Sequence, residues 1–200
     1  AYTIQEGDNN YLKSVVTFGY PIDIEVRRKL QFYTSIYRTQ SIKNTNSPYV
    51  YDHFSLNLLV PYTDDLNFNI ILKAGASDVA DSIWNRDGYH QNIFALGGKG
   101  TLRGYEWKQF PTSHYFLTTL EIWFDEFGIL YDRAVIFESP GNQFSSDFLD
   151  DLSENISTNV KHSAGISFGD EDVSLSFIRQ LNGNNKTNIY LTLSFDVPIQ

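Results

Sequence analysis

No cysteine and no methionine occur in this chain of 200 residues. Without cysteine, neither a disulfide framework nor a thiolate metal site can form. Without methionine, Ala1 is not the translated start, so we expect either a mature form after signal-peptide removal or a piece of a longer protein. No run of about eighteen apolar residues occurs, which excludes a transmembrane helix. Membrane-crossing strands are apolar only at every second position and are not excluded.

Basic residues are outnumbered, with 15 Lys and Arg against 24 Asp and Glu and a net charge of −9. An acidic surface repels a phosphate backbone, so we expect no nucleic-acid partner. Aromatic residues are abundant instead, with 13 Tyr, 15 Phe and 3 Trp. Their flat rings suit the pleated surface of strands. A chain of this length usually forms one domain, and we expect residues 1–200 to do so.

Side-chain character alternates with a period of two along most of the chain, as in strands with one apolar face. Near the end, Ile189, Leu191 and Leu193 alternate with Tyr190 and Thr192. The alternation and its breaks predict nine strands, at 12–20, 29–38, 50–61, 66–76, 114–124, 129–138, 159–169, 171–181 and 187–197. Many are close to the length of about ten residues that a tilted strand needs to cross a bilayer.

The connections between these strands alternate between short and long. The short ones lie at 62–65, 125–128 and around Asp170, and the long ones at 39–49, 77–113, 139–158 and 182–186. Outer-membrane barrels have short periplasmic turns and long external loops. A soluble barrel of lipocalin type shares this alternation but turns its apolar face inward.

The polar faces of the strands mix Lys, Asp, Glu, Asn, Ser and Gly. This mixture favours the lining of a wet lumen over that of a lipid-binding cup. The pattern therefore predicts an all-β fold, an antiparallel transmembrane β-barrel of about eight to ten strands or the C-terminal part of a larger barrel.

The connection at 77–113 carries a glycine-rich motif, Gly97-Gly98-Lys99-Gly100-Thr101-Leu102-Arg103-Gly104-Tyr105. It is not a nucleotide loop, because the Walker pattern requires Ser or Thr directly after Gly-Lys. The motif resembles the hallmark loop of the outer-membrane protein insertase superfamily, the bacterial surface antigen or BamA-type barrels. In that family, paired glycines precede Val/Leu-Arg-Gly-Phe/Tyr. The matching residues here are Gly97, Gly98, Leu102, Arg103, Gly104 and Tyr105.

The resemblance extends to the strands after the loop. In the family, the loop folds back into the lumen and the next strand carries a lumenal Glu, to which Glu121 corresponds. The following strand carries Phe-x-Asp and then Gly, which Phe137 and Gly141 match while Ser139 replaces the Asp. Five predicted strands follow the loop, as in the family. A guanidinium inside a lumen needs carboxylate partners, so we expect Arg103 to meet Glu121 in an anchor that Ser139 weakens.

The resemblance implies a barrel that assists the insertion or export of other proteins without covalent chemistry, with weakly paired first and last strands that accept client strands. The implied location is the bacterial outer membrane, and the implied partners are its lipids and client outer-membrane proteins. Two alternatives stay open. One is a structural barrel subunit of an outer-membrane complex, and the other is an export barrel excised from a longer patatin-type lipase.

We expect no enzymatic activity, no cofactor and no metal site. The chain has no Gly-x-Ser-x-Gly elbow. Its four histidines, at 53, 90, 114 and 162, do not have the spacing of helical metal ligands. The acidic run from Asp147 to Glu154 fits a solvated external loop.

Nine strands conflict with the even counts of single-chain bacterial barrels. Either 12–20 is not a full barrel strand, or a further strand forms near Tyr2–Gln5, which gives eight or ten. About eight strands leave an interior that their own side chains fill. The connection at 77–113 would then cap the lumen from outside, or the chain would share a larger barrel. Because unpaired edges are costly in lipid, we expect a homo-oligomer or a larger membrane complex.

Overall fold

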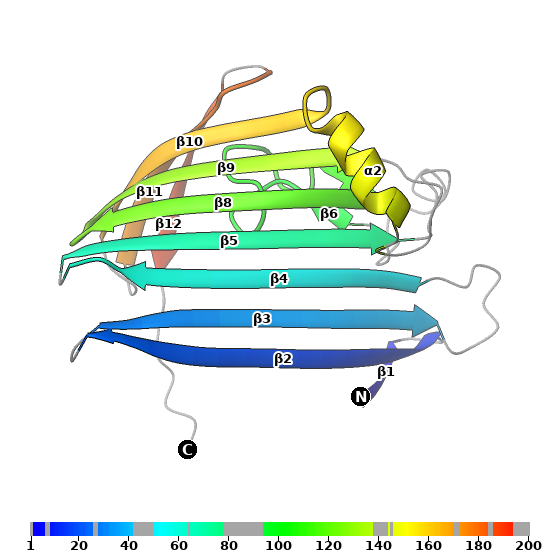
Figure 1. Ribbon diagram of the computed structural model, residues 1–200. Helices are drawn as coiled ribbons and strands as arrows, with labels where there is room; N and C mark the ends of the chain where they lie inside the picture. The colour runs from blue at the N-terminus through cyan, green and yellow to red at the C-terminus, as the bar shows by residue number, and fades with distance from the viewer. Residues whose placement is uncertain are drawn as a thin grey trace.

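The structure is a computed structural model that describes residues 2–6, 9–25, 28–41, 50–63, 65–77, 94–137, 144, 146–169, 173–183 and 186–193. Most of this chain forms one antiparallel sheet (Figure 1). The strands follow one another in the sheet in their order along the chain, and β5 pairs with β8 across the long connection. The predicted all-β, antiparallel class is therefore confirmed.

The main sheet contains ten strands. They are β1 (Tyr2–Glu6), β2 (Asn9–Glu25), β3 (Arg28–Ser41), β4 (Val50–Pro61), β5 (Leu66–Ser77), β8 (His114–Phe124), β9 (Phe127–Phe137), β10 (Val160–Gly169), β11 (Val173–Gln180) and β12 (Thr187–Leu193). A separate pair, β6 (Phe94–Leu96) and β7 (Phe110–Thr112), joins the two ends of the glycine-rich loop.

The bounds of β4 and β8 coincide with the predicted strands, and β1 forms where the additional strand was expected. β2 is longer than the predicted 12–20, because its ladder with β3 continues from Tyr11 to Glu25. The alternation of apolar and polar residues weakens outside 12–20, and there the pairing with the neighbouring strand determines how far β2 extends. The short pair β6 and β7 was not predicted.

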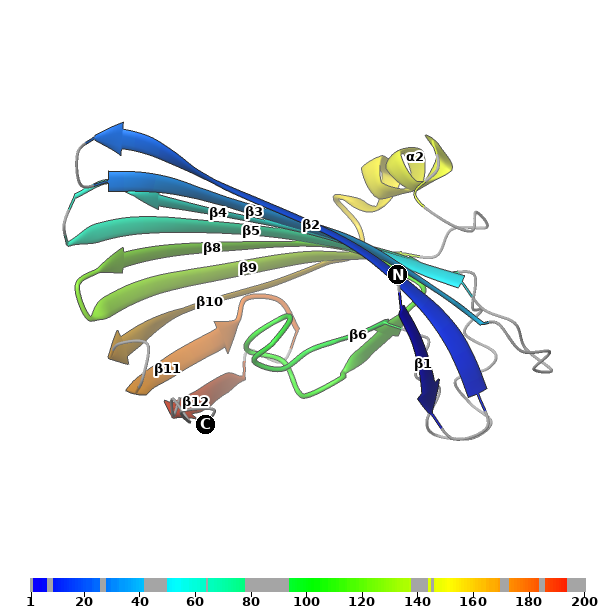
Figure 2. The ribbon, with the colours of Figure 1, turned by 90° about the horizontal axis from the view of Figure 1, so that it is seen from below.

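The sheet is curved and has a concave and a convex face (Figure 2). The loop that carries β6 lies on the concave side, together with the curled end of the sheet at β11 and β12. Among the residues that the structure describes, no ladder joins β1 to β12. In this part of the chain the sheet is thus curved but open, with β1 and β12 as its edges.

The period-two pattern decides which side chains face outward. On β8, the apolar Leu120, Ile122 and Phe124 are 39%, 40% and 60% exposed on the convex face, while Glu121 points to the concave face. Neighbouring strands continue this exposed apolar surface with Phe127, Ile129, Ile166, Phe168, Val173, Leu175, Ile189 and Leu191. The apolar side of the sheet therefore faces outward, opposite to the arrangement of a lipocalin-type cup.

A helix, α2 (Ser146–Asn155), replaces the solvated loop that the acidic run predicted, so that prediction was wrong. Phe148 and Leu152 lie four residues apart on one side of it, and Asp147 occupies its first turn, where the helix dipole favours an acid. Phe148 is buried against Phe137, with ring centroids 5.2 Å apart, in a convex-face cluster that includes Val135. Figures 1 and 2 show α2 lying across the outside of the sheet. No helix among the described residues is long and apolar enough to span a membrane.

Candidate functional site

The glycine-rich loop depends on backbone conformations that favour glycine. Gly97, Gly98 and Gly104 have φ angles of 119°, 94° and 84°. A Cβ atom on Gly97 would lie 2.2 Å from the backbone oxygen of Glu106, so a larger residue does not fit there. Thr101 tightens this turn, because its hydroxyl accepts a bond from the Gly97 N–H at 2.9 Å and donates to the Gly97 carbonyl at 3.1 Å.

Apolar side chains fix the loop to the concave face of the sheet. Leu102 and Tyr105 are buried in a cluster with Tyr115 and Leu117 of β8 and Ala134 of β9. Burial of large apolar side chains stabilises by about 1.5–3 kcal/mol each. The motif is therefore part of a packed core and not a solvated loop.

The Arg103 side chain is the polar centre of the site. Its Nε and Nη2 donate to the two oxygens of Asp132 at 2.8 and 2.7 Å, and its Nη1 donates to Glu121 at 2.7 Å. The backbone N–H of Arg103 adds a bond to Asp132 at 3.0 Å. The bidentate geometry gives a strong and directional ion pair. One arginine thus joins the loop to β8 and β9 together.

Both carboxylates have further donors that fix their positions. Asp132, whose side chain is 1% exposed, accepts from the Thr119 hydroxyl at 2.8 Å. Glu121 accepts from Asn69 at 3.0 Å and from the Trp123 indole at 3.3 Å. Burial by itself lowers the pKa of Arg103, but the hydrogen bonds and charges of Asp132 and Glu121 outweigh burial and raise that pKa above its ordinary value. The guanidinium therefore stays charged.

The structure confirms one of the three expected loop partners and corrects a second. Glu121 meets Arg103, as the sequence predicted. Phe137 does not, because it lies on the convex face beneath α2. Ser139 lies outside the described residues. The second carboxylate is not missing, since Asp132 supplies it five residues before Phe137. Sequence reasoning missed Asp132, although it lies an odd number of positions from the outward-facing Ile129 and therefore falls on the concave face.

The peptide of Gly104 connects the loop to the far end of the sheet. Its N–H donates to the Tyr190 hydroxyl at 2.9 Å, and its carbonyl accepts from Gln180 at 2.9 Å and from Asn188 at 2.7 Å. Gln180 lies on β11, and Asn188 and Tyr190 lie on the edge strand β12. A Cβ at position 104 would lie 3.0 Å from Cβ of Ser163, so glycine permits this close approach. These partners of the loop were not predicted.

Tyr105 connects the loop to β10 and to the segment between β11 and β12. Its hydroxyl donates to the carbonyl of His162 at 3.0 Å or to the side-chain oxygen of Asn182 at 2.5 Å. Asn182 in turn accepts from the His162 N–H at 2.9 Å. Burial raises the pKa of the Tyr105 hydroxyl, and the backbone bond at His162 offsets this only in part. The three residues 103–105 therefore hold five successive strands, from β8 to β12.

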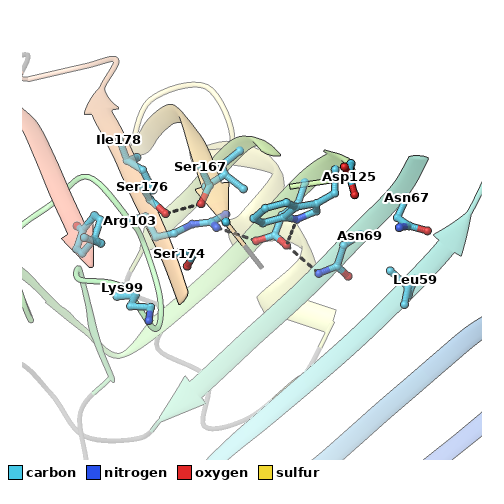
Figure 3. Close-up of a pocket in the computed structure, with 15 residues that line it drawn as sticks. Leu59, Asn67, Asn69, Lys99, Arg103, Asp125, Ser167, Ser174, Ser176 and Ile178 are labelled. Carbon is cyan, nitrogen blue, oxygen red and sulfur yellow. Dashed lines mark hydrogen bonds and ion pairs between the residues drawn. The ribbon is translucent and has the colours of Figure 1, made fainter. Parts of the chain in front are cut away.

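A cavity of about 730 Å³ lies beside Arg103 on the concave face (Figure 3). On one side it is lined by Asn67, Asn69 and Trp123, and on the other by Ser176 and further residues of β10 to β12. Amide, hydroxyl and carboxylate groups in such a wall suit bound water or an extended polar backbone. The fifteen lining residues include neither a cysteine that could act as a nucleophile nor a histidine that could act as the base of a serine.

Comparison with models of known protein families gives no match to this chain, and no curated protein matches its sequence either.

Proposed function

We propose that this chain forms a transmembrane β-barrel wall in a bacterial outer membrane and that it assists the insertion or export of other proteins without covalent chemistry. The observation that carries the proposal is the attachment of the Leu-Arg-Gly-Tyr loop to the concave face. Arg103 fixes the loop to β8 and β9, and Gly104 bonds to the edge strand β12. The resemblance to the insertase superfamily rests on the same residues.

The distribution of apolar side chains supports a membrane location. The convex face exposes a band of large aliphatic and aromatic residues, whereas the concave face carries the Arg103 ion pairs and the amide of Asn69. Exposed apolar patches of this extent mark interaction with lipid or with other proteins. Strands that alternate apolar-outward and polar-inward are typical of outer-membrane barrels.

The open edges support a role in which another strand is accepted. In hydrocarbon, each unpaired backbone group costs several kcal/mol, so β12 and β1 would pair with each other, with a client strand or with a second chain. The loop holds β12 from the concave side through side chains, which leaves the outer ladder positions of β12 available for exchange. A homo-oligomer or a larger membrane complex satisfies the same requirement.

The experiment that tests this function is insertion of a client barrel into vesicles that contain the protein. A urea-unfolded small outer-membrane protein is added, and its folding is followed by the gel shift of the heat-modifiable folded form. The expected result is faster folding than in protein-free vesicles. A photoreactive phenylalanine replacing Ile189 on β12 should crosslink to the client, while the same probe replacing Ile129 on the central strand β9 serves as control, because both side chains are at least half exposed.

Equal folding rates with and without the protein would refute insertion activity. Crosslinking from Ile129 as strong as from Ile189 would refute a role of the edge strand. Membrane location is tested separately, because a protein that remains monodisperse without detergent would contradict the membrane barrel itself. Size measurement in detergent, corrected for bound detergent, distinguishes a monomer from the proposed association.

A further inference from the structure

A group of polar side chains interrupts the apolar convex face at the level where α2 lies against the sheet. The group consists of Tyr131 and Arg133 on β9, His162 on β10 and Arg179 on β11. The ladders place them together, since Arg133 is the partner of His162, and Tyr131 and Arg179 are both partners of Ala164. The Tyr131 hydroxyl and His162 Nδ1 share a hydrogen bond of 2.7 Å.

The two arginines have spare binding capacity. Arg133 donates from Nη2 to the carbonyl of Ile156 at 2.9 Å, and its Nε is buried without a partner. Arg179 is exposed. Among the residues that the structure describes, neither arginine forms an ion pair with a carboxylate, in contrast to Arg103. Within the described part of the chain, two cations on a mostly apolar surface therefore have no carboxylate paired with them.

This group lies at one limit of the exposed apolar band. One ladder step toward the short turns, the outward residues are Ile129, Ile166 and Ile189, all exposed and apolar. On the opposite side, α2 covers the wall instead of leaving it exposed. The arginines thus mark the upper limit of the exposed apolar band on β9 to β11.

The orientation of α2 agrees with this boundary. At 100° per residue, Leu149 and the following Ile156 fall on one flank of the helix, and Asp150 and Glu154 fall on the side away from the buried Phe148 and the partly buried Leu152. The carbonyl of Ile156 is bonded to Arg133, which lies nearer the apolar band than the covered Val135. The apolar flank therefore faces the band, and the acidic side of the helix faces away from the sheet. Helices at membrane interfaces have this division.

We propose that Arg133 and Arg179, with Tyr131 and His162 between them, bind the phosphate of an anionic lipid headgroup in the leaflet on the long-loop side. Guanidinium groups bind phosphate by charge-assisted, often bidentate, hydrogen bonds. Strands are spaced about 4.8 Å apart, so long side chains from β9 and β11 reach one headgroup above the small Ala164. The acyl chains of that lipid would lie on the isoleucines below. This inference rests on the membrane location proposed above.

Native mass spectrometry of the protein in detergent tests the site, with phosphatidylglycerol and phosphatidylcholine of identical acyl chains as probes. We expect the wild type to prefer phosphatidylglycerol by about tenfold or more, and the double variant Arg133→Gln/Arg179→Gln to lose most of that preference. The matched control, Lys108→Gln/Lys186→Gln, removes the same charge from exposed loop positions and should keep the preference. Inorganic phosphate should not displace the lipid, because it gains nothing from the apolar band.

A preference retained by the arginine double variant, or lost equally in the lysine control, would overturn the site. Displacement by inorganic phosphate alone would also overturn it, since the site would then bind any phosphate. Each variant is first checked for the heat-dependent gel shift of the wild type. A wild type that folds into membranes but does not select headgroups refutes only this inference. A wild type that needs no detergent refutes the proposed function instead.

Discussion

Replacement of Arg103 by alanine should be among the most destabilising single changes in this protein. The substitution removes three charge-assisted hydrogen bonds of the side chain, two to Asp132 and one to Glu121, at 2.7–2.8 Å, and leaves two carboxylates without their cation. The Asp132 side chain is 1% exposed and the Glu121 side chain 15%. Removal of one partner of a buried ion pair typically costs about 3–5 kcal/mol. We expect a loss in this range for Arg103→Ala.

The two carboxylates should not contribute equally. Asp132 forms the bidentate pair, accepts from the backbone of Arg103 and is almost fully buried, so Asp132→Ala should cost about 3 kcal/mol or more. Glu121 makes a single contact with the guanidinium and is more exposed, so Glu121→Ala should cost less, about 1–2 kcal/mol. The double variant Arg103→Ala/Asp132→Ala should be more stable than the sum of its single changes predicts, because both remove the same interaction.

The assay is reversible urea unfolding in lipid vesicles, followed by the gel shift of the folded form. The exposed pair of Lys186 and Glu106 provides the control, since its nitrogen–oxygen distance of 3.0 Å is similar but its side chains are 53% and 67% exposed. Loss of that pair should cost about 0–1 kcal/mol. Additivity of Arg103→Ala and Asp132→Ala within about 0.5 kcal/mol would show that the two residues do not interact in the folded protein.

Three further predictions follow from the packing of the loop and of α2. Gly104→Ala should destabilise by about 1–3 kcal/mol in the same unfolding assay, because its φ of 84° and the nearby Ser163 disfavour a Cβ; a neutral result would contradict the close approach. Phe148→Ala should cost about 3–5 kcal/mol, whereas Leu149→Ala, 64% exposed, should change stability in detergent by about 0.5 kcal/mol or less. Burial raises the pKa of the Tyr105 hydroxyl, so its contribution to the free energy of unfolding is complete below the pKa of about 10 in the unfolded chain and is lost as the pH rises above that value. Because phenylalanine does not ionise, Tyr105→Phe should lose less stability than the wild type between about pH 10 and 12. Equal losses would contradict the burial of this hydroxyl.

Much of the sheet follows from the sequence because its alternation is strong. Leu120, Ile122 and Phe124 alternate with Glu121 and Trp123, and a one-residue shift would turn every side chain to the wrong face. The same alternation places Glu121 on the concave face, and there Arg103 binds it. Local pattern and tertiary structure agree in these strands, so their bounds and faces were predictable.

The remaining features depend on contacts between segments that are distant in the sequence. Asp132 was overlooked because the second carboxylate was sought near Ser139, yet its ladder partner Thr119 lies two residues from Glu121. The i, i+4 spacing of Phe148 and Leu152 indicates a helix, but the acidic residues around it favoured a loop. That α2 covers Val135 and its neighbours could not be foreseen, because lipid and a helix require the same apolar surface.

The loop tip has a mechanical consequence for the protein. Residues 103–105 crosslink the two ends of one curved half of the sheet, because Arg103 bonds to β8 and β9 and Gly104 bonds to β11 and β12. This crosslink limits the curvature of that half of the sheet, because strands β8 to β12 cannot flatten without breaking the arginine ion pairs or the hydrogen bonds of Gly104. A change in the curvature of the sheet would therefore occur mainly in strands β1 to β4. Of the two open edges in the described part of the chain, β1 is then the freer to move, while the bonds of Gly104 hold β12 in place.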